Sequence, residues 1–397
     1  MNKKRSVAAV AAAATLALTA CAPGGGGTNA DSDGPIKIGV IADLTGATGD
    51  VGTPYNKGML GYVKWRNAEG GIDGRDIEAI SKDYAYDVPT AERLYKEYLN
   101  EGVVAIQGWG TGDSEALMSK VSADELPFMS ASYAEVLTDP EEAPYNFVVA
   151  PTYSDQMRVG LNWIAEDAGG PAEVAMFHND SPFGLAPLED GLSWISDEGL
   201  DLNMEAYPMP AESANYVGLL SQARSQGAKY IVIQNVSAPA SQVAKDIVAQ
   251  GLDMRIVCLN WCADEQFIDS AGDGAEGHVL VQPFAPGSAE LDGHEVIEEF
   301  LQGEGSSLEE EGLHYVQGWY TMHMMAEGIA QALANGDDLT GTAIKEALEG
   351  MEPIDTGGVV GTGEVEFSED SHRGQTGTGV YVAEDGVMEP LDLGVTP

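Results

Sequence analysis

Basic residues are scarce in this chain. Its 397 residues include 19 lysines and arginines against 64 aspartates and glutamates, so the formal net charge is −45 at pH 7. Such a charge argues against nucleic acid as a partner and against electrostatic docking on an anionic membrane. The acids are spread along the chain, and 44% of the residues are hydrophobic, which is typical of a folded protein rather than a disordered one. We therefore interpret the acidity as a solvated surface.

The residues that catalytic and metal sites need are also few. The six histidines are scattered, and none stands at metal-ligand spacing from another histidine or a cysteine. The chain has no Gly-x-Ser-x-Gly elbow, no Walker-type phosphate loop and no His-Glu-x-x-His motif. The glycine-rich run Gly108–Gly112 lacks the spacing of a dinucleotide fingerprint. The sequence thus predicts no enzyme, no metal and no cofactor, and a hydrolase would need a nucleophile–base pair that is not apparent.

Long apolar runs are missing after the N-terminus, which has the pattern of an export signal. Lys3, Lys4 and Arg5 precede a short apolar stretch, Val7 to Leu18, that is too brief to span a bilayer. The sequence Leu18-Thr19-Ala20-Cys21 then resembles a bacterial lipobox. We expect residues 1–20 to be a signal peptide, Cys21 to be lipid-modified, and residues 21–35 to form a flexible tether. The predicted location is outside the cytoplasm, with the protein anchored to the cell membrane by lipid.

Only two cysteines, Cys258 and Cys262, remain after the lipidation site. In an exported protein they could form a disulfide, but the loop that it closes is short and would stabilise little. Two small buried thiols are the alternative, and the sequence leaves both open.

Strand and helix patterns alternate from Ile36 onward, which predicts parallel sheets with helical crossovers. The rhythm breaks at residues 140–151 and then restarts with a helix for which Ser154 is a plausible N-cap. Two similar α/β halves are therefore expected. The glycine-rich tail has short strand-like runs, and we expect it to pack on one lobe.

The most informative stretch is Val103 to Tyr133. A buried strand leads into a loop of small residues around Trp109, a helix follows, and a second strand leads into Ala131-Ser132-Tyr133. Loops of this kind place backbone N–H groups and short hydroxyls at the carboxyl edge of a parallel sheet, where open α/β folds bind ligands. We expect a small molecule to bind at this edge.

Three segments carry a resemblance to a known family. Ile36 to Gly46, Asn67 to Arg75 and Asp83 to Asp87 resemble type I periplasmic binding proteins of the leucine/isoleucine/valine group. The resemblance implies a fold of two doubly wound parallel-sheet lobes joined by a three-segment hinge. It places residues 36–151 and 284–353 in lobe 1, and residues 152–283 and 354–397 in lobe 2.

The resemblance also implies a function. The chain would be the monomeric substrate-binding lipoprotein of an ABC importer, closing its lobes on an amino-acid-like molecule and passing it to a membrane permease. Two alternatives stay open: a receptor for a signalling partner, and a binding protein for amides, urea or aromatic acids.

Loops that hold the ligand's carboxylate and ammonium in this family correspond to Gly108–Asp113 and Ala131–Ala134. This chain departs from that pattern, with Gly112 where a serine is usual and Ala134 where a threonine is usual. An ammonium would need Asp113, Asp155 or Asp264 as its partner. The predicted ligand-binding residues are Trp109, Thr111, Gly112, Asp113, Ser132, Tyr133, Asp155, Phe183, Asn235, Asn260 and Trp261.

Overall fold

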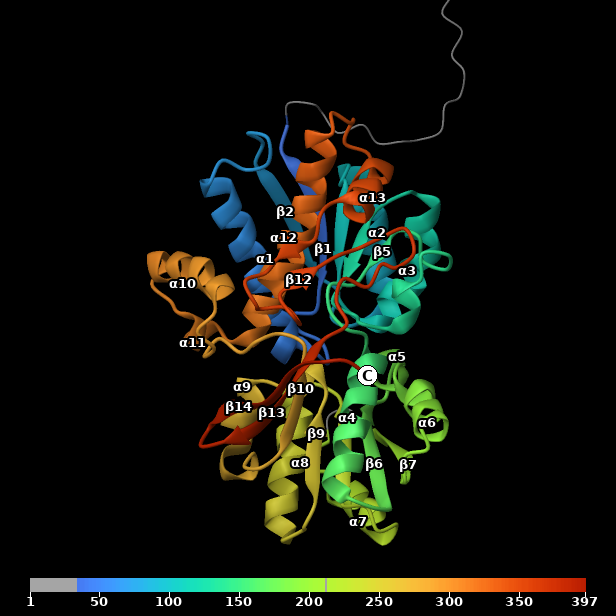
Figure 1. Cartoon of the computed structure of the whole chain (residues 1–397). Coiled ribbons are helices and arrows are strands. Elements are labelled where there is room, and N and C mark those ends of the chain that lie inside the picture. The colour runs from blue at the N-terminus through green and yellow to red at the C-terminus, as the bar shows by residue number, and fades with distance from the viewer. Residues whose placement is uncertain (1–33, 211–212) are drawn as a thin grey trace, which may run out of the picture.

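Two parallel sheets, one above the other in Figure 1, form the centres of two lobes. The computed structural model describes residues 34–210 and 213–397; the predicted signal peptide and Cys21 lie outside them. Each sheet contains five parallel strands in which the first strand lies between the second and the third. The predicted repeat of architecture is therefore confirmed.

The strands of lobe 1 are all parallel, and helices pack around their sheet in Figure 1. In spatial order they are β2 (Ile77–Asp83), β1 (Ile36–Ala42), β3 (Ala105–Gly108), β4 (Phe128–Ser130) and β5 (Asn146–Phe147). The helices of this lobe are α1 (Gly49–Ala68), α2 (Val88–Glu101), α3 (Thr111–Ala123), α10 (Asp292–Glu304), α11 (Leu308–Glu311), α12 (Leu313–Ala334) and α13 (Gly341–Gly350), with a 3₁₀ turn η1 (Glu135–Thr138).

Lobe 2 extends the same pattern by two antiparallel strands at one edge. Its strands are, in spatial order, β7 (Leu202–Met209), β6 (Ala172–Asn179), β8 (Tyr230–Gln234), β9 (Arg255–Cys258), β10 (Val279–Gln282), β13 (Thr378–Glu384) and β14 (Val387–Val395). Its helices are α4 (Tyr153–Ala168), α5 (Pro182–Leu185), α6 (Leu188–Asp197), α7 (Val217–Ser225), α8 (Ser237–Gln250) and α9 (Glu265–Ala271), with 3₁₀ turns η2 (Asn260–Cys262) and η3 (Gly272–Gly274).

Three chain segments cross between the lobes, and they hydrogen-bond to one another. Val148 in the first crossover pairs with Arg373 in the third, and Phe284 in the second pairs with Val360. These bridges tie the crossovers into one hinge, as the resemblance implies.

The third crossover comes later in the chain than predicted. Strands β11 (Ile354–Asp355) and β12 (Glu364–Val365) pair with each other, and Val365 and Phe367 belong to the core of lobe 1. His372 stacks on Phe147 with ring centroids 4.1 Å apart. The tail is thus divided between the lobes: residues 354–375 pack on lobe 1, and only β13 and β14 join lobe 2.

One further expectation changes, and one open alternative is decided. The N-cap of α4 is Thr152 rather than Ser154, because Thr152 and Asp155 each accept a hydrogen bond from the other's backbone N–H in a capping box. Cys258 and Cys262 are free, buried thiols, so no disulfide joins them.

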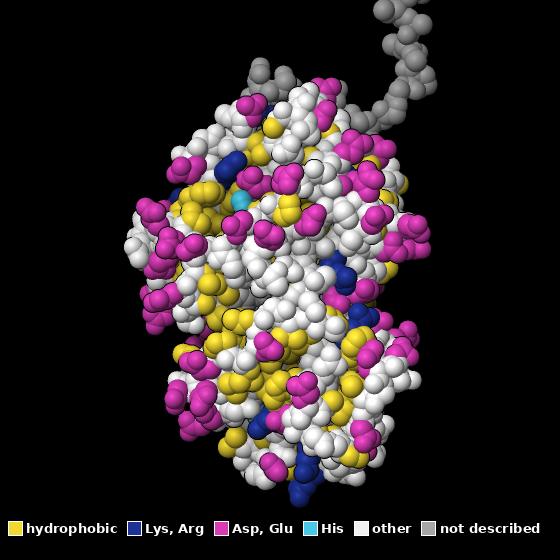
Figure 2. All heavy atoms as spheres, viewed as in Figure 1, with side chains coloured by type: hydrophobic (Ala, Val, Ile, Leu, Met, Phe, Trp, Pro, Cys, Tyr) yellow, Lys and Arg dark blue, Asp and Glu magenta, His cyan; other side chains and the backbone are white. Residues whose placement is uncertain are grey.

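The surface bears out the charge pattern of the sequence. On the face shown in Figure 2, acidic side chains are spread over both lobes. Within residues 34–210 and 213–397, no helix has the length and apolar character needed to span a membrane.

Helices α1 and α12 meet at glycines, which lets their backbones touch. A Cβ atom on Gly58 would lie 1.9 Å from the carbonyl oxygen of Tyr315, and one on Gly318 would lie 1.9 Å from that of Tyr55. No side chain fits at either position unless the helices move apart. This crossing fixes where α12 begins, at the boundary between the lobes.

We expect Gly318→Ala to lower the free energy of unfolding by about 1–3 kcal/mol, because the added methyl group overpacks a backbone contact. Gly303→Ala is the matched control, since a Cβ atom there meets nothing within 4 Å; it should be neutral or stabilise by up to about 1 kcal/mol. Denaturant unfolding of both variants measures the difference. Equal effects would show that the crossing is not constrained.

Candidate functional site

A cavity lies between the lobes where the strands of both sheets end. Its lining alternates between loops of lobe 1 and lobe 2, and consists of Thr48, Tyr86, Trp109, Gly110, Thr111, Tyr153, Phe183, Val236 and Trp261. Trp109 follows β3, Val236 follows β8 and Trp261 follows β9. The carboxyl ends of strands in open α/β sheets are where ligands bind. None of these nine residues is an aspartate, glutamate, histidine, lysine or arginine.

Aromatic rings fill most of this space. Trp109 and Trp261 approach from opposite lobes with ring centroids 5.0 Å apart, and Tyr133 stacks on Trp261 at 5.7 Å. Tyr153 and Phe183 make a similar pair at 5.4 Å. The space left among the rings is about 20 Å³, which is room for about one water molecule. A ligand therefore needs the lobes to separate or an indole ring to move.

Hydrogen bonds hold both indoles in place. Asp43 accepts hydrogen bonds from the backbone N–H and the hydroxyl of Thr48, at 2.9 and 2.7 Å. The Thr48 oxygen in turn accepts the indole N–H of Trp109 at 2.8 Å. Across the cavity, the indole N–H of Trp261 donates to the Tyr153 hydroxyl at 2.8 Å. The two rings are therefore anchored independently, one in each lobe.

The glycine-rich loop presents the N-terminus of α3. Its N-cap is Gly110, which has no side chain to cap the helix, and backbone N–H groups at a helix N-terminus favour an anion. The hydroxyls of Thr111 and Ser132 lie 2.7 Å apart beside them. This arrangement can bind a carboxylate.

Asp113 lies behind the loop rather than in the cavity. Its carboxylate accepts the Tyr84 hydroxyl at 2.8 Å, and the side chain is about 1% exposed. Burial raises the pKa of Asp113 to about 7, although the Tyr84 hydrogen bond opposes the shift. The group is therefore only partly ionised at neutral pH.

The other two acids considered as partners for an ammonium are fully engaged. Asp155 belongs to the α4 capping box and pairs with Arg373 at 2.9 Å and Arg158 at 3.3 Å. Asp264 caps α9 and bonds to His314 at 2.5 Å. No unpaired carboxylate lines the cavity among the described residues.

The structure brings together four of the predicted residues, namely Trp109, Thr111, Phe183 and Trp261, as lining of the cavity. Four others lie next to the cavity without lining it: Gly112 and Asp113 in the first turn of α3, and Ser132 and Tyr133 in the loop after β4. The remaining three serve the fold: Asp155 in the cap, Asn235 in bonds to Asn179 and Val236, and Asn260 in a bond to Gln317. As ligand contacts, all of them stay predictions.

The predicted residues omit five that line the cavity: Gly110, which lies in a loop expected to hold the ligand, and Thr48, Tyr86, Tyr153 and Val236. Thr48 and Tyr86 follow β1 and β2, so the strand-end rule that found Trp109 could have found them too. Tyr153 opens a helix directly after a crossover, and no local pattern marks that position.

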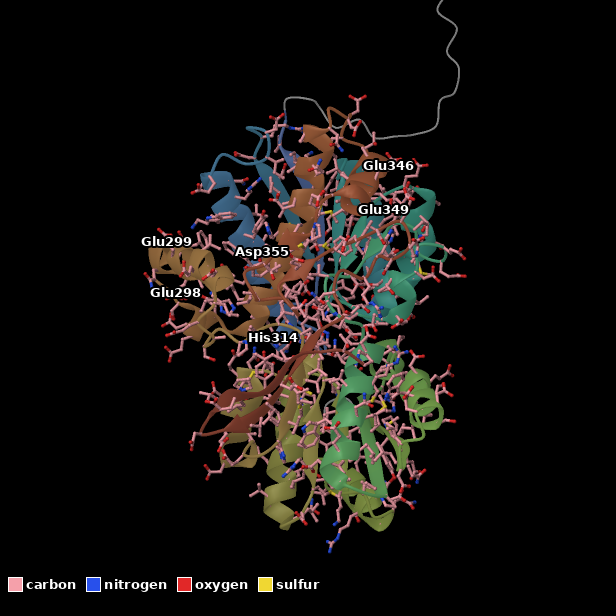
Figure 3. All side chains as sticks on the ribbon, in the orientation of Figure 1. Glu298, Glu299, His314, Glu346, Glu349 and Asp355 are labelled. Carbon is pink, nitrogen blue, oxygen red and sulfur yellow. The ribbon has the colours of Figure 1, made fainter. Side chains whose placement is uncertain are left out.

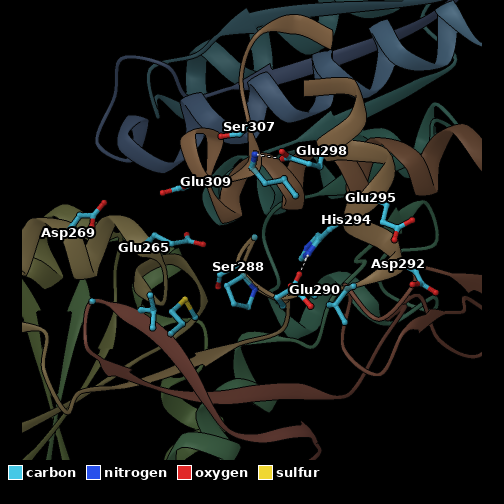
Figure 4. Close-up of a pocket in the computed structure, with 18 residues that line it drawn as sticks. Glu265, Asp269, Ser288, Glu290, Asp292, His294, Glu295, Glu298, Ser307 and Glu309 are labelled. Atoms are coloured by element: carbon cyan, nitrogen blue, oxygen red, sulfur yellow. Dashed lines mark hydrogen bonds between the residues drawn. The ribbon is translucent and has the colours of Figure 1, made fainter. Parts of the chain in front are cut away.

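A larger hollow of about 880 Å³ lies elsewhere, between α9, α10 and the turn that joins β13 to β14 (Figure 4). Its lining includes the acids Glu265, Asp269, Glu290, Asp292, Glu295, Glu298 and Glu309. None of the loops that follow the strands of lobe 1 contributes to it, and no described group of three or more acids, histidines or cysteines is arranged to hold a metal. We therefore assign the site to the smaller, aromatic cavity.

The family model described as periplasmic binding protein matches residues 35–386 of the chain. The chain belongs to the periplasmic binding protein family. It is accordingly a substrate-binding protein of two α/β lobes and not an enzyme, as the sequence predicts. Family membership also supports a location outside the cytoplasm.

Curated relatives of this binding protein share low sequence identity with it. The leucine-, isoleucine-, valine-, threonine- and alanine-binding protein of Pseudomonas aeruginosa is 22% identical over 63% of this chain and 67% of that protein. The Leu/Ile/Val-binding protein of Escherichia coli K12 is 23% identical over 62% and 67%.

Solved structures match more of the chain. An ABC transporter substrate-binding protein of Aeropyrum pernix is 27% identical with a TM-score of 0.81, covering 90% of this chain and 95% of that one. A branched-chain amino acid ABC transporter protein of Thermus thermophilus, solved with bound valine, has a TM-score of 0.87 at 24% identity, covering 92% and 97%. At that identity the second match shows the fold alone.

The buried carboxyl of Asp113 predicts a pH-dependent stability. Its folded-state pKa of about 7 lies above the unfolded value, so its contribution to stability is fully present below about pH 4 and is lost as the pH rises through 7. Asp113→Asn, which cannot ionise, should therefore gain stability relative to the wild type between pH 5 and pH 8. Denaturant unfolding at the two pH values measures this gain, and a difference that does not change with pH would contradict it. Asp139→Asn, at a turn, is the control.

Proposed function

We propose that this binding protein captures a small molecule between its lobes and delivers it to the permease of an ABC importer. The observation that carries the proposal is the cavity at the strand ends, to which both lobes contribute side chains. The relatives support it as well, because the Aeropyrum pernix protein is described as an ABC transporter substrate-binding protein. We further propose that the chain acts as a monomer.

The ligand would sit with a carboxylate or amide oxygen at the N-terminus of α3, beside Thr111 and Ser132. Trp109 and Trp261 would hold its apolar part. Closing of the lobes would then exclude water from the polar end, which strengthens the hydrogen bonds to it. The ligand would enter when the lobes move apart by a hinge motion about the three crossovers.

The charges around the cavity favour a ligand without an ammonium group. Asp155 and Asp264 are paired, and burial keeps Asp113 partly neutral. Burying an ammonium without a paired acid costs on the order of several kcal/mol. Planar acids, amides and urea are therefore our first candidates. Branched-chain amino acids are the second, supported by the printed names of the relatives; Asp113 would have to ionise to bind them.

The anchor and the partner are parts of the proposal as well. Lipid modification at Cys21 would anchor the protein to the cell membrane, in the periplasm or on the outer face of the cytoplasmic membrane. That location would keep it within reach of a permease. A sensor kinase is the alternative partner, since the same closing motion could report ligand to it. Genes for a permease and an ATPase beside this one would favour import.

A ligand panel tests the proposal directly. The purified protein is titrated with benzoate, phenylacetate, acetamide, urea, leucine, isoleucine and valine, and both thermal unfolding and tryptophan fluorescence are followed. A ligand at 100 times its Kd stabilises the protein by about 2.7 kcal/mol. We expect a planar acid or amide to raise the melting temperature and alter the fluorescence. A response to the amino acids alone favours branched-chain amino acids as the ligand. If no compound changes the melting temperature or the fluorescence, both classes of ligand are rejected.

Trp261→Ala should weaken the ligand found in this way by about 10- to 100-fold, because a stacking surface and its buried area are lost. Trp163→Ala is the control; Trp163 lies on α4 and packs near Tyr230 and Arg255, away from the cavity. Calorimetric titration of both variants measures the affinities. Equal losses would place the ligand elsewhere.

A further inference from the structure

Direct contacts between the lobes beside Trp261 are made largely by groups that titrate. His314 bonds to Asp264 at 2.5 Å, and the backbone N–H of Leu313 donates to Glu265 at 3.2 Å. Asp50 accepts the backbone N–H of Ala238 at 3.1 Å. Leu313, His314 and Asp50 belong to lobe 1, and their partners belong to lobe 2. Figure 3 shows His314 at the waist between the lobes.

The hydrogen-bond network fixes which way the amides near His314 point. The side-chain N–H₂ of Gln282 donates to the carbonyl oxygens of Asn260 and Ala263, so its oxygen faces Gln317. Gln317 must therefore donate with its own N–H₂ group, and it does so to Gln282 and to the side-chain oxygen of Asn260. The remaining amide oxygen of Gln317 faces Nδ1 of His314 at 2.6 Å.

Both ring nitrogens of His314 consequently face acceptors. Nδ1 must carry a hydrogen to donate to Gln317. Nε2 faces the carboxylate of Asp264, which also accepts the hydroxyl of Ser237 and the backbone N–H of Phe267. A neutral imidazole has only one N–H, so the ring and the carboxylate must hold one additional proton between them. His314 is 2% exposed and Asp264 is fully buried.

The surroundings of the ring favour its positive charge. The charged groups that act on it are all acids: Asp264 and Glu265 from the start of α9, and Asp50 from α1. Trp261 stacks on the ring with centroids 5.4 Å apart and planes 23° apart, which places a π-face against the cation. The N-terminus of α12 opposes the charge, but the three acids outweigh it.

We propose that closing of the two lobes takes up a proton at His314, so that the cavity holds its ligand more tightly as the pH falls. The proposal rests on the proposed function in one respect only, namely that the lobes open and close. Opening must separate His314 from Asp264 and return both to water. The proton then has no buried partner to hold it.

The sign follows from the pKa of His314. Burial alone would lower it, but the hydrogen bond and the charge of Asp264 outweigh burial and raise it above 6.5 in the closed protein. The closed form therefore binds the proton more tightly than the open form. The stability that this proton gives the closed form is fully present below the pKa of His314 in the open form. It is lost as the pH rises through the pKa of His314 in the closed form. Burial also raises the pKa values of Glu265 and Asp50, so these groups act in the same direction at lower pH.

Two ligand-free measurements on the full chain test this coupling. NMR titration of the ¹³C-labelled histidine rings gives the midpoint of His314, which is assigned by its loss in His314→Gln. Small-angle scattering gives the radius of gyration at pH 6 and pH 9. We expect a midpoint above 6.5 and a larger radius at pH 9. A midpoint at or below 6.5, or a radius that does not change with pH, would overturn the proposal.

Variants separate coupling from a general loss of structure. Asp264→Asn should shift the His314 midpoint below 6.5, because burial then acts without its counter-charge. His314→Gln should abolish the pH dependence of the radius while the protein stays cooperatively folded on thermal melting. His323→Gln, nine residues further along α12, should preserve that dependence, since His323 bonds to Tyr62 within lobe 1. None of these measurements needs a known ligand. A ligand panel in which no compound binds can therefore be distinguished from a protein whose lobes do not respond to pH.

Discussion

The contact between α1 and α12 is the constraint on which the cleft depends. The two helices touch backbone to backbone at Gly58 and Gly318, so neither can slide or rotate without a clash. Tyr55 on α1 and His314 on α12 are thereby fixed at the boundary of the lobes, one against the indoles and the other against Asp264. A helix from late in the chain thus packs beside a cavity whose aromatic rings follow strands in both lobes.

Closing the lobes buries polar groups, and each needs a partner. An isolated charge in such a place costs several kcal/mol, whereas a paired and hydrogen-bonded one is tolerated. The chain meets this demand by setting the acids of lobe 2 against a histidine and backbone N–H groups of lobe 1. Asp264 is thereby paired with a histidine and Glu265 with a backbone N–H group, and no acidic or basic side chain lines the cavity beside them. In our proposal, the same pairing stabilises the closed form and favours a ligand without an ammonium group.

Family membership fixes the fold more firmly than the ligand. The fold is shared with a protein of 27% identity, because the strand order and the burial pattern tolerate many sequences. In our proposal, specificity rests instead on a few loop residues such as Gly112, Asp113 and Trp261, which can change without disturbing the sheets.

The sequence by itself determined the alternating fold, the two lobes and the strand-end loops that carry Trp109, Thr111, Phe183 and Trp261, because these features have local signatures in periodicity and small-residue loops. It could not show that Asp155 is engaged by Arg373, or Asp264 by His314. Nor could it place residues 354–375 on lobe 1. Each of these depends on contacts between segments far apart in the chain, which leave no pattern in either segment alone. Only the tertiary structure therefore decided which acids remain free to meet a ligand.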